Sequence, residues 1–135
     1  MTRFLRPVPI SGRLTSPLVL APGAVAAGVL LLQPTTDVEL DDLRISFYAP
    51  SPVVPGVNVT FLIRTIRVGD NLIWNDDVGT DGRNFGADST LRLMLHGATG
   101  SPAQPIVISG DFRNLGSAAS GTAATVSATA IGRKR

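Results

Sequence analysis

Among its 135 residues the sequence has no cysteine, a single histidine, His96, and a single glutamate, Glu39. Without cysteine there are no disulfides, no thiolate metal ligands and no cysteine nucleophile. One histidine cannot supply the ligand set of a usual zinc site. These scarcities exclude most metal-dependent hydrolases and most Ser/His or Cys/His catalytic arrangements. We therefore expect a protein that is not an enzyme and needs no cofactor. A hydrolase that uses Glu39 and an aspartate is the remaining enzymatic alternative.

Charge is also scarce, at 16% of residues, and it is unevenly distributed. Residues 1–13 carry three arginines and no acid, and residues 133–135 are all basic. The segment between them holds six arginines and ten acids. Basic tails commonly contact an acidic partner, although a solvated terminus has the same composition. Aromatic residues make up only 5% of the chain. Specific nucleic-acid binding is therefore not expected, because stacking platforms need aromatics.

Helix breakers are abundant, with 14 glycines and 10 prolines. Proline lacks a backbone N–H and glycine loses much entropy in a helix, so this content disfavours helices. Valine, isoleucine and threonine, which favour strands, are common in the rest of the chain. The composition predicts an all-β protein, an antiparallel β-sandwich or jelly-roll-like domain.

Hydrophobic patterns predict seven or eight strands. The continuous apolar run at 24–33 predicts a fully buried strand, and the polar stretch at 35–42 predicts a turn or a short helical turn. Alternation at 43–49 places Leu43, Ile45 and Phe47 on one face. Further strands are predicted at 57–68, 72–74, 90–96, 106–112 and 125–131. Residues 69–71 are expected to form the turn of a β-hairpin.

The first 23 residues are predicted to form an extended arm, followed by a single β-domain at 24–135 with a basic C-terminal tail. Four prolines in this segment favour extended backbone. The segment is also too rich in large apolar residues for a disordered linker. We therefore expect the arm to lie on its own domain or on a neighbouring subunit.

The apolar segment at 18–32 is the only candidate for a membrane or targeting sequence. It is shorter than the roughly 20 residues of a bilayer-spanning helix and is broken by Pro22-Gly23. A secretory signal is disfavoured because only a short apolar stretch precedes the potential cleavage site at 24–26. Synthesis in the cytoplasm, with no membrane association, is the expectation.

A glycine-rich acidic loop is expected at 75–88. Asp77, Asp81 and Asp88 match three ligand positions of a calcium-binding loop, with Gly82 at the turn. Gly79 and Phe85 occupy positions where that loop needs ligands, and the last ligand is Asp instead of Glu. A β-turn loop explains the same residues, because Asp and Gly favour turns. No metal ligand is assigned.

A Pro-rich N-terminal arm followed by a compact, Cys-free β-domain resembles the decoration, or cement, proteins of tailed-phage capsids. The resemblance is one of general plan and rests on no motif. It implies a virion protein on the capsid surface that is assembled in the host cytoplasm. It also implies a homo-oligomer, with a trimer favoured, that clamps major capsid or other virion proteins. The implied partner-binding residues lie in the arm and the tail: Arg3, Phe4, Leu5, Arg6, Val8, Ile10, Arg13, Leu14, Arg133, Lys134 and Arg135.

Two other binding functions fit the same composition. One is a tail, baseplate or other virion adaptor protein with a similar sandwich. The other is a small carbohydrate-binding module, which would need a row of exposed aromatics. Only Tyr48, Trp74 and Phe85 are suitable for such a row.

Overall fold

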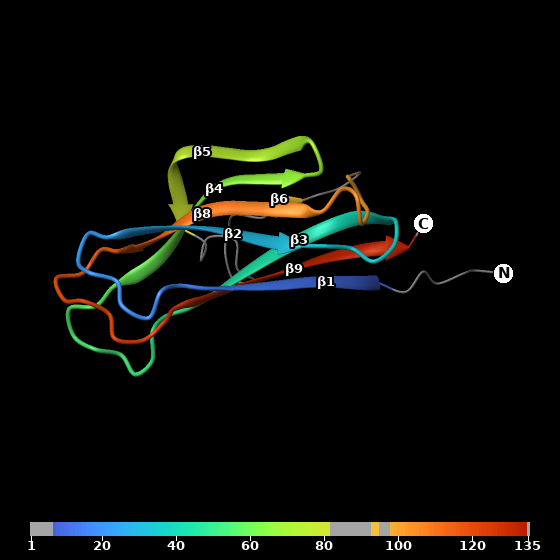
Figure 1. Cartoon of the computed structure of the whole chain (residues 1–135). Coiled ribbons are helices and arrows are strands. Elements are labelled where there is room, and N and C mark those ends of the chain that lie inside the picture. The colour runs from blue at the N-terminus through green and yellow to red at the C-terminus, as the bar shows by residue number, and fades with distance from the viewer. Residues whose placement is uncertain (1–6, 82–92, 95–97, 135) are drawn as a thin grey trace.

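The computed structural model describes residues 7–81, 93–94 and 98–134, and all regular secondary structure in these residues is β-strand (Figure 1). The strands are β1 (Pro7–Thr15), β2 (Val25–Leu32), β3 (Val38–Tyr48), β4 (Val59–Val68), β5 (Asn71–Asp81), β6 (Leu93–Met94), β7 (Thr99–Gly100), β8 (Ile106–Asn114) and β9 (Thr125–Lys134). Among the described residues there is no helix long and apolar enough to cross a membrane. The all-β prediction is confirmed.

Two antiparallel sheets pack face to face to form a sandwich. Sheet A has the order β1-β9-β3-β6, with β7 also paired to β3, and sheet B has the order β2-β8-β4-β5. The first strand thus pairs with the last, β2 with β8, β3 with β6, and β4 with β5. This nested pairing is one long hairpin wrapped into two sheets, which is the jelly-roll arrangement.

Alternating side chains from both sheets fill the space between them. In β3 the alternation is as predicted, because Leu43 and Ile45 are buried and Phe47 packs against the core. Phe61 of β4 and Phe112 of β8 are cross-strand partners whose ring centroids lie 4.8 Å apart. The core side of β9, in the interior of sheet A, is lined by Val126, Ala128 and Ala130, and Ala124 just before the strand is buried as well. Small residues there leave room for the large side chains of sheet B.

The predicted full burial of residues 24–33 is wrong. This run forms β2, an edge strand of sheet B, and only alternate residues face the core. Leu30 and Leu32 are buried, whereas Val25, Val29 and Leu31 are exposed. Both faces are apolar, so the sequence pattern could not reveal the alternation.

Two β-bulges make β3 and β5 longer than predicted. In β3 the register shifts between Leu40 and Asp42, so the predicted turn at 35–42 is wrong from Val38 onward. In β5 the residues 76–79 bulge out opposite Arg64, and the strand resumes with Thr80. A bulge shifts the alternation of side chains by one residue, which hides the strand from a period-two pattern.

Residues 7–23 belong to the β-domain, so the predicted boundary at residue 23 is wrong. The expected extended conformation is present, but as β1, which pairs with β9 from Pro7↔Arg133 to Thr15↔Thr125. Ile10 is buried in the core, and so is Leu20 in the following loop. The remainder of the predicted arm, residues 1–6, lies outside the described residues.

Glycine allows β1 and β2, which belong to different sheets, to approach closely. A Cβ atom at Gly12 of β1 would lie 2.6 Å from the carbonyl oxygen of Leu31 and 2.7 Å from Cδ2 of Leu32. A Cβ atom at Gly28 of β2 would likewise lie 2.6 Å from Cδ2 of Leu14. Any larger residue would push the strands apart, so the two glycines close this side of the sandwich.

Candidate functional site

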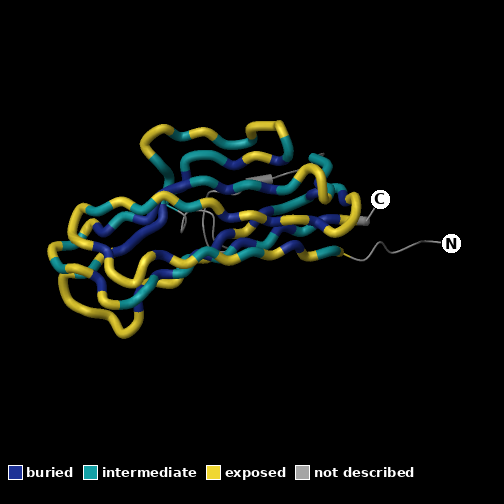
Figure 2. The backbone as a smooth tube through the Cα atoms, in the orientation of Figure 1, coloured by how far each residue is buried: buried dark blue, intermediate teal, exposed yellow. Residues whose placement is uncertain are grey.

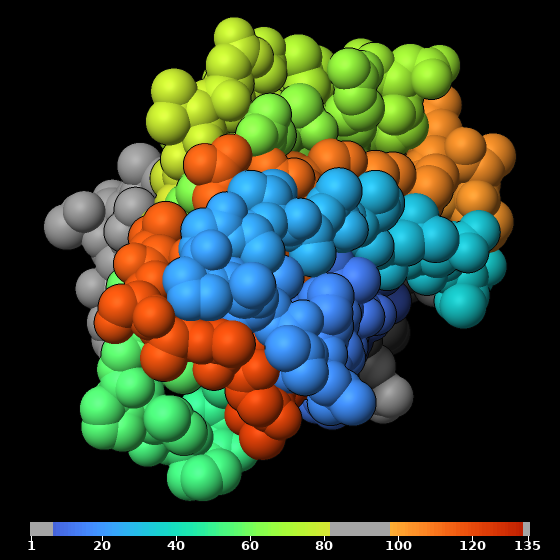
Figure 3. All heavy atoms as spheres, turned by 60° about the vertical axis from the view of Figure 1, so that its left-hand side comes forward, coloured from blue at the N-terminus to red at the C-terminus, as the bar shows by residue number. Residues whose placement is uncertain are grey.

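The jelly roll has two chemically different ends. The loops 16–24, 49–58 and 115–124, which we call the loop end, lie at the left in Figure 1, and both chain termini lie at the right. Figure 3 turns the loop end toward the viewer and shows atoms of the three loops side by side.

Asn114, at the end of β8, holds the three loops together. Its side chain is fully buried. The amide nitrogen donates to the carbonyl oxygens of Leu20 at 2.9 Å and Ala118 at 2.8 Å. The amide oxygen accepts from the backbone N–H groups of Gly116 at 3.0 Å and Asn58 at 3.3 Å. One side chain thus satisfies backbone groups from all three loops, which buried polar groups require.

Two serines add further ties between the first and third loops. The Ser120 hydroxyl accepts from the N–H of Leu20 at 2.8 Å, and the Ser120 N–H donates to the Leu20 carbonyl at 3.0 Å. The Ser16 hydroxyl accepts from the N–H of Ala124 at 2.8 Å. The loops are therefore fixed relative to one another by buried hydrogen bonds, and they form one continuous surface.

The outer surface of the loop end is uncharged and apolar. None of the residues in its three loops is Asp, Glu, Lys, Arg or His. Eleven large apolar side chains stand out as exposed in the described residues, and five of them belong to the loop end: Leu18, Val19, Val53, Val54 and Leu115. Figure 2 shows these loops as a mostly exposed region of the backbone. Grouped exposed apolar side chains mark protein-interaction sites more often than singly scattered ones.

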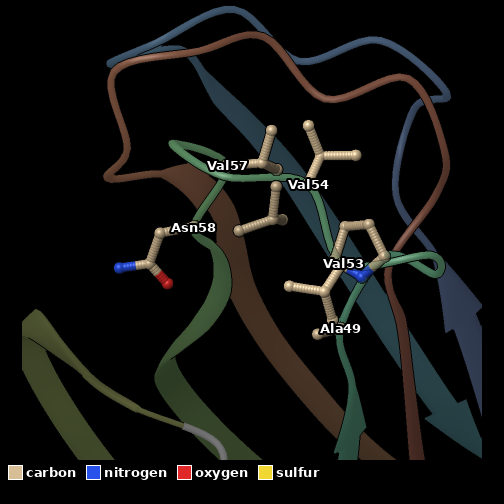
Figure 4. Close-up of a pocket in the computed structure, with 7 residues that line it drawn as sticks. Ala49, Val53, Val54, Val57 and Asn58 are labelled. Carbon is tan, nitrogen blue, oxygen red and sulfur yellow. The ribbon is translucent and has the colours of Figure 1, made fainter.

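A small apolar hollow lies within the second loop (Figure 4). Its lining is Ala49, Pro50, Val53, Val54, Val57, Asn58 and Val59, and its volume is about 60 Å³. Sites for small organic ligands usually measure about 300–1,000 Å³. The hollow is therefore suited to receive part of one side chain from a partner, and it is too small for a metabolite.

At the opposite end the fold pairs the start of β1 with the end of β9. Pro7, which follows Arg6 in the sequence, is the cross-strand partner of Arg133. The exposed side chain of Arg133 forms an ion pair within the domain. Its Nε and Nη2 atoms donate to the two carboxylate oxygens of Asp41, both at 2.9 Å. These bonds and the nearby carboxylate raise the pKa of the Arg133 guanidinium.

The predicted partner-binding residues fall into three groups. Ile10 is buried in the core of its own domain, and the partly buried Val8 and Leu14 pack against that core. Arg13 is exposed on β1, and Arg133 is exposed but engaged with Asp41. Lys134 ends β9, and the remaining predicted residues lie outside the described ranges: Arg3, Phe4, Leu5, Arg6 and Arg135.

The predicted acidic loop is, up to Asp81, part of β5. Asp77 is exposed, Asp81 accepts a hydrogen bond from the Thr60 hydroxyl at 3.1 Å, and Asp88 lies outside the described residues. In the part of the chain that the structure describes, no three His, Asp or Glu side chains gather to hold a metal ion. Asp76 instead caps the bulge, accepting from the Thr80 hydroxyl at 2.6 Å and the Val78 N–H at 3.1 Å.

These hydrogen bonds, that of Thr80 first, lower the pKa of Asp76 from its usual 3.8. A lowered pKa means that folding stabilises the carboxylate. This contribution to stability is present above pH 3.8 and is lost as the pH falls through the lower, folded pKa. We expect the Thr80→Val substitution to move the Asp76 titration midpoint upward in an NMR titration. An unchanged midpoint would show that Thr80 does not hold the carboxylate.

The aromatic row required for carbohydrate binding is not formed by the described aromatics. Tyr48 is exposed at the end of β3 in sheet A. Trp74 belongs to β5 in sheet B and packs against the core. The third predicted member, Phe85, lies outside the described residues. The two described rings therefore cannot stack on one sugar chain.

The loop end was not predicted, although the sequence carries a signal for it. Four long stretches contain no Asp, Glu, Lys or Arg, namely 14–36, 45–63, 93–110 and 114–132, and three of the four each contain one of the loops. Charge-free segments of this length are unusual for loops, which normally carry polar and charged residues at the surface. Comparison with known protein families, with curated proteins and with solved structures finds no match for this chain.

Proposed function

We propose that this protein is a non-enzymatic structural component of a virus particle, a decoration protein that binds neighbouring subunits of the capsid. The observation that carries the proposal is the β1–β9 register. In this register Pro7, which follows the basic N-terminal segment in the sequence, pairs with Arg133, the first residue of the basic C-terminal segment. A concentrated cationic end is suited to an acidic protein surface.

The distribution of ion pairs supports this role for the terminal segments. Several arginines of the body are engaged within the domain: Arg64 with Asp111 at 2.7 Å, Arg44 with Asp42 at 3.5 Å, and Arg133 with Asp41. Arg3, Arg6 and Arg135 lie outside the described residues, and Lys134 is the last residue of β9. They are the cations we assign to contacts with another protein.

Phe4 and Leu5 lie between Arg3 and Arg6 in the sequence, so the N-terminal segment can supply apolar as well as charged contacts.

The experiment compares the full chain with a chain that begins at Pro7 for binding to purified particles that lack the protein. We expect the full chain to sediment with DNA-filled particles at a fixed ratio to the major capsid protein. Removal of residues 1–6 should reduce the bound fraction at least tenfold. At low salt the double variant Arg3→Ser/Arg6→Ser should bind more weakly than the full chain. The difference between the two should be smaller at high salt, because exposed charge contacts are screened.

A matched control is Arg67→Ser, which removes one exposed arginine from sheet B and should bind like the full chain. Absence of the protein from purified wild-type particles would contradict the virion assignment. Binding to isolated tails in place of capsids would identify a tail or baseplate component, and the capsid role would be rejected.

A further inference from the structure

We infer that the loop end is the surface through which copies of this chain bind one another. The inference is independent of the proposed attachment to a particle, because it concerns the opposite end of the domain. It rests on three properties of the loop end: its lack of charge, its size and its rigidity. Each is considered in turn.

The absence of charge in the three loops favours a partner surface that is also uncharged. A surface rich in acidic or basic groups would lose the solvation of those groups on binding here, with no opposite charge to compensate. The three loops of one copy can meet the same loops of another without placing like charges together, because none of the three carries a charged residue.

The size of the surface matches what a stable oligomer needs. The five exposed Leu and Val side chains alone present on the order of 400 Å² of apolar surface. Exposed proline, alanine, glycine and serine residues of the same loops surround them, among them Pro17, Pro22, Pro52, Pro55 and Ala119. A standard interface buries about 800 Å² on each partner. The five side chains alone therefore present about half of the area that each partner of a standard interface buries, and the neighbouring exposed residues add to it.

The rigidity of the surface lowers the cost of association. Flexible loops would lose conformational entropy when an interface forms. Here that entropy has already been lost on folding, because Asn114, Ser120 and Ser16 hold the loops through buried hydrogen bonds. Five of the ten prolines of the chain also lie in these loops and restrict the backbone further. The exposed apolar side chains are thus displayed in fixed positions.

The same geometry defines the arrangement of the oligomer. The termini lie at the end of the domain away from the loop end (Figure 1). Copies that meet by their loop ends around a symmetry axis point their termini outward, and each terminal segment stays free for another partner. The hollow beside Val53 and Val54 would receive an apolar side chain from the neighbouring copy.

Sedimentation velocity over a range of concentrations tests the inference. We expect the wild-type chain to form a discrete oligomer at micromolar concentration. Val53→Lys and Leu115→Lys place a charge on two different loops and should each weaken association at least tenfold. Val53 is 86% exposed, so the lysine is tolerated in the monomer. The matched control is Val78→Lys, because Val78 is 77% exposed but lies on β5, outside the loop end.

The lack of cysteine permits a second, positional test. A single cysteine replaces exposed Ala119 in the loop end or exposed Asn75 on β5. Under mild oxidation the Ala119→Cys chain should form a disulfide-linked dimer at least tenfold faster than the Asn75→Cys chain. Circular dichroism of each variant establishes that the domain remains folded.

Three outcomes would overturn the inference. These are a wild-type chain that stays monomeric at 100-fold higher concentration, equal weakening by Val53→Lys and Val78→Lys, and equal cross-linking rates for the two cysteine variants. Binding of a monomeric wild-type chain to neutral phosphatidylcholine vesicles would also overturn it and would assign the loop end to a lipid surface. None of these outcomes bears on whether residues 1–6 attach the protein to particles, which separates the two proposals.

Discussion

A chain that begins at Ser16, and therefore lacks β1, is expected not to fold. β1 covers one edge of β9 along nine residue pairs, and Ile10 is buried between the sheets. Val8 and Leu14 pack against the same core. Loss of three such side chains removes about 5 kcal/mol of hydrophobic stabilisation. That loss is comparable to the whole net stability of a typical domain, about 5–15 kcal/mol.

The control for this truncation is the chain that begins at Pro7, which retains all of β1. We expect its melting temperature to stay within about 3 °C of that of the full chain. Circular dichroism melting curves and one-dimensional NMR spectra distinguish the two truncations. A cooperative transition and dispersed amide signals in the chain that begins at Ser16 would show that β1 is an added arm, which would restore the boundary predicted from the sequence.

The Asn114→Ala substitution is expected to lower the free energy of unfolding by about 4 kcal/mol, since it leaves several buried backbone groups without partners. The amide of Asn114 bonds to groups of Leu20, Asn58, Gly116 and Ala118. Each buried group left unsatisfied costs about 1–3 kcal/mol, partly relieved when water enters. The corresponding fall in melting temperature is about 15 °C.

Thermal and urea denaturation measure this effect, with Asn75→Ala as the matched control. Asn75 is exposed on β5, so its replacement should change stability by less than about 0.5 kcal/mol. Loosening of the loops in Asn114→Ala should also weaken self-association, even under conditions in which the domain stays folded. A melting temperature within about 3 °C of wild type would show that Asn114 does not organise the loop end.

The sequence predicts the fold class and much of the strand pattern correctly. Alternation is clear where one strand face is apolar and the other is polar, as in 43–48, where Arg44 and Ser46 are exposed opposite buried Leu43 and Ile45. The strands at 59–68, 106–114 and 125–134 are likewise confirmed, with ends that differ from the prediction by a few residues. Turn residues define the hairpin at Gly69, whose φ of +58° suits glycine.

The errors occur where the period-two signal is lost. β2 is apolar on both faces, because its outer face carries Val25, Val29 and Leu31. β3 and β5 contain bulges, which shift the alternation at Asp41 and at 76–79. β1 contains two prolines, Pro7 and Pro9, and prolines in this segment favoured an arm over a strand in the sequence-based prediction. Proline is nevertheless tolerated in a strand at the edge of a sheet, which is where β1 lies. Composition alone does not show whether a strand lies at an edge.

The sequence predicts more of the basic segments than of the loop end. The basic segments are visible in the sequence, but their meeting at Pro7 and Arg133 depends on pairing the first strand with the last. The loop end depends on buried bonds between groups far apart in the chain, such as Asn114 and Leu20. Long-range pairing of this kind leaves no local pattern, so only the absence of charge marks these loops in advance.

The pairing of the first and last strands has a consequence during protein synthesis. The hydroxyls of Ser11 and Thr129, 118 residues apart, lie within 3.0 Å of each other on β1 and β9. Since β9 also separates β1 from β3, sheet A cannot form on a nascent chain whose last strand is still inside the ribosome. Topologies with such distant contacts fold slowly, after loop closure. Prematurely terminated chains thus lack an interior strand of sheet A and stay open to proteases.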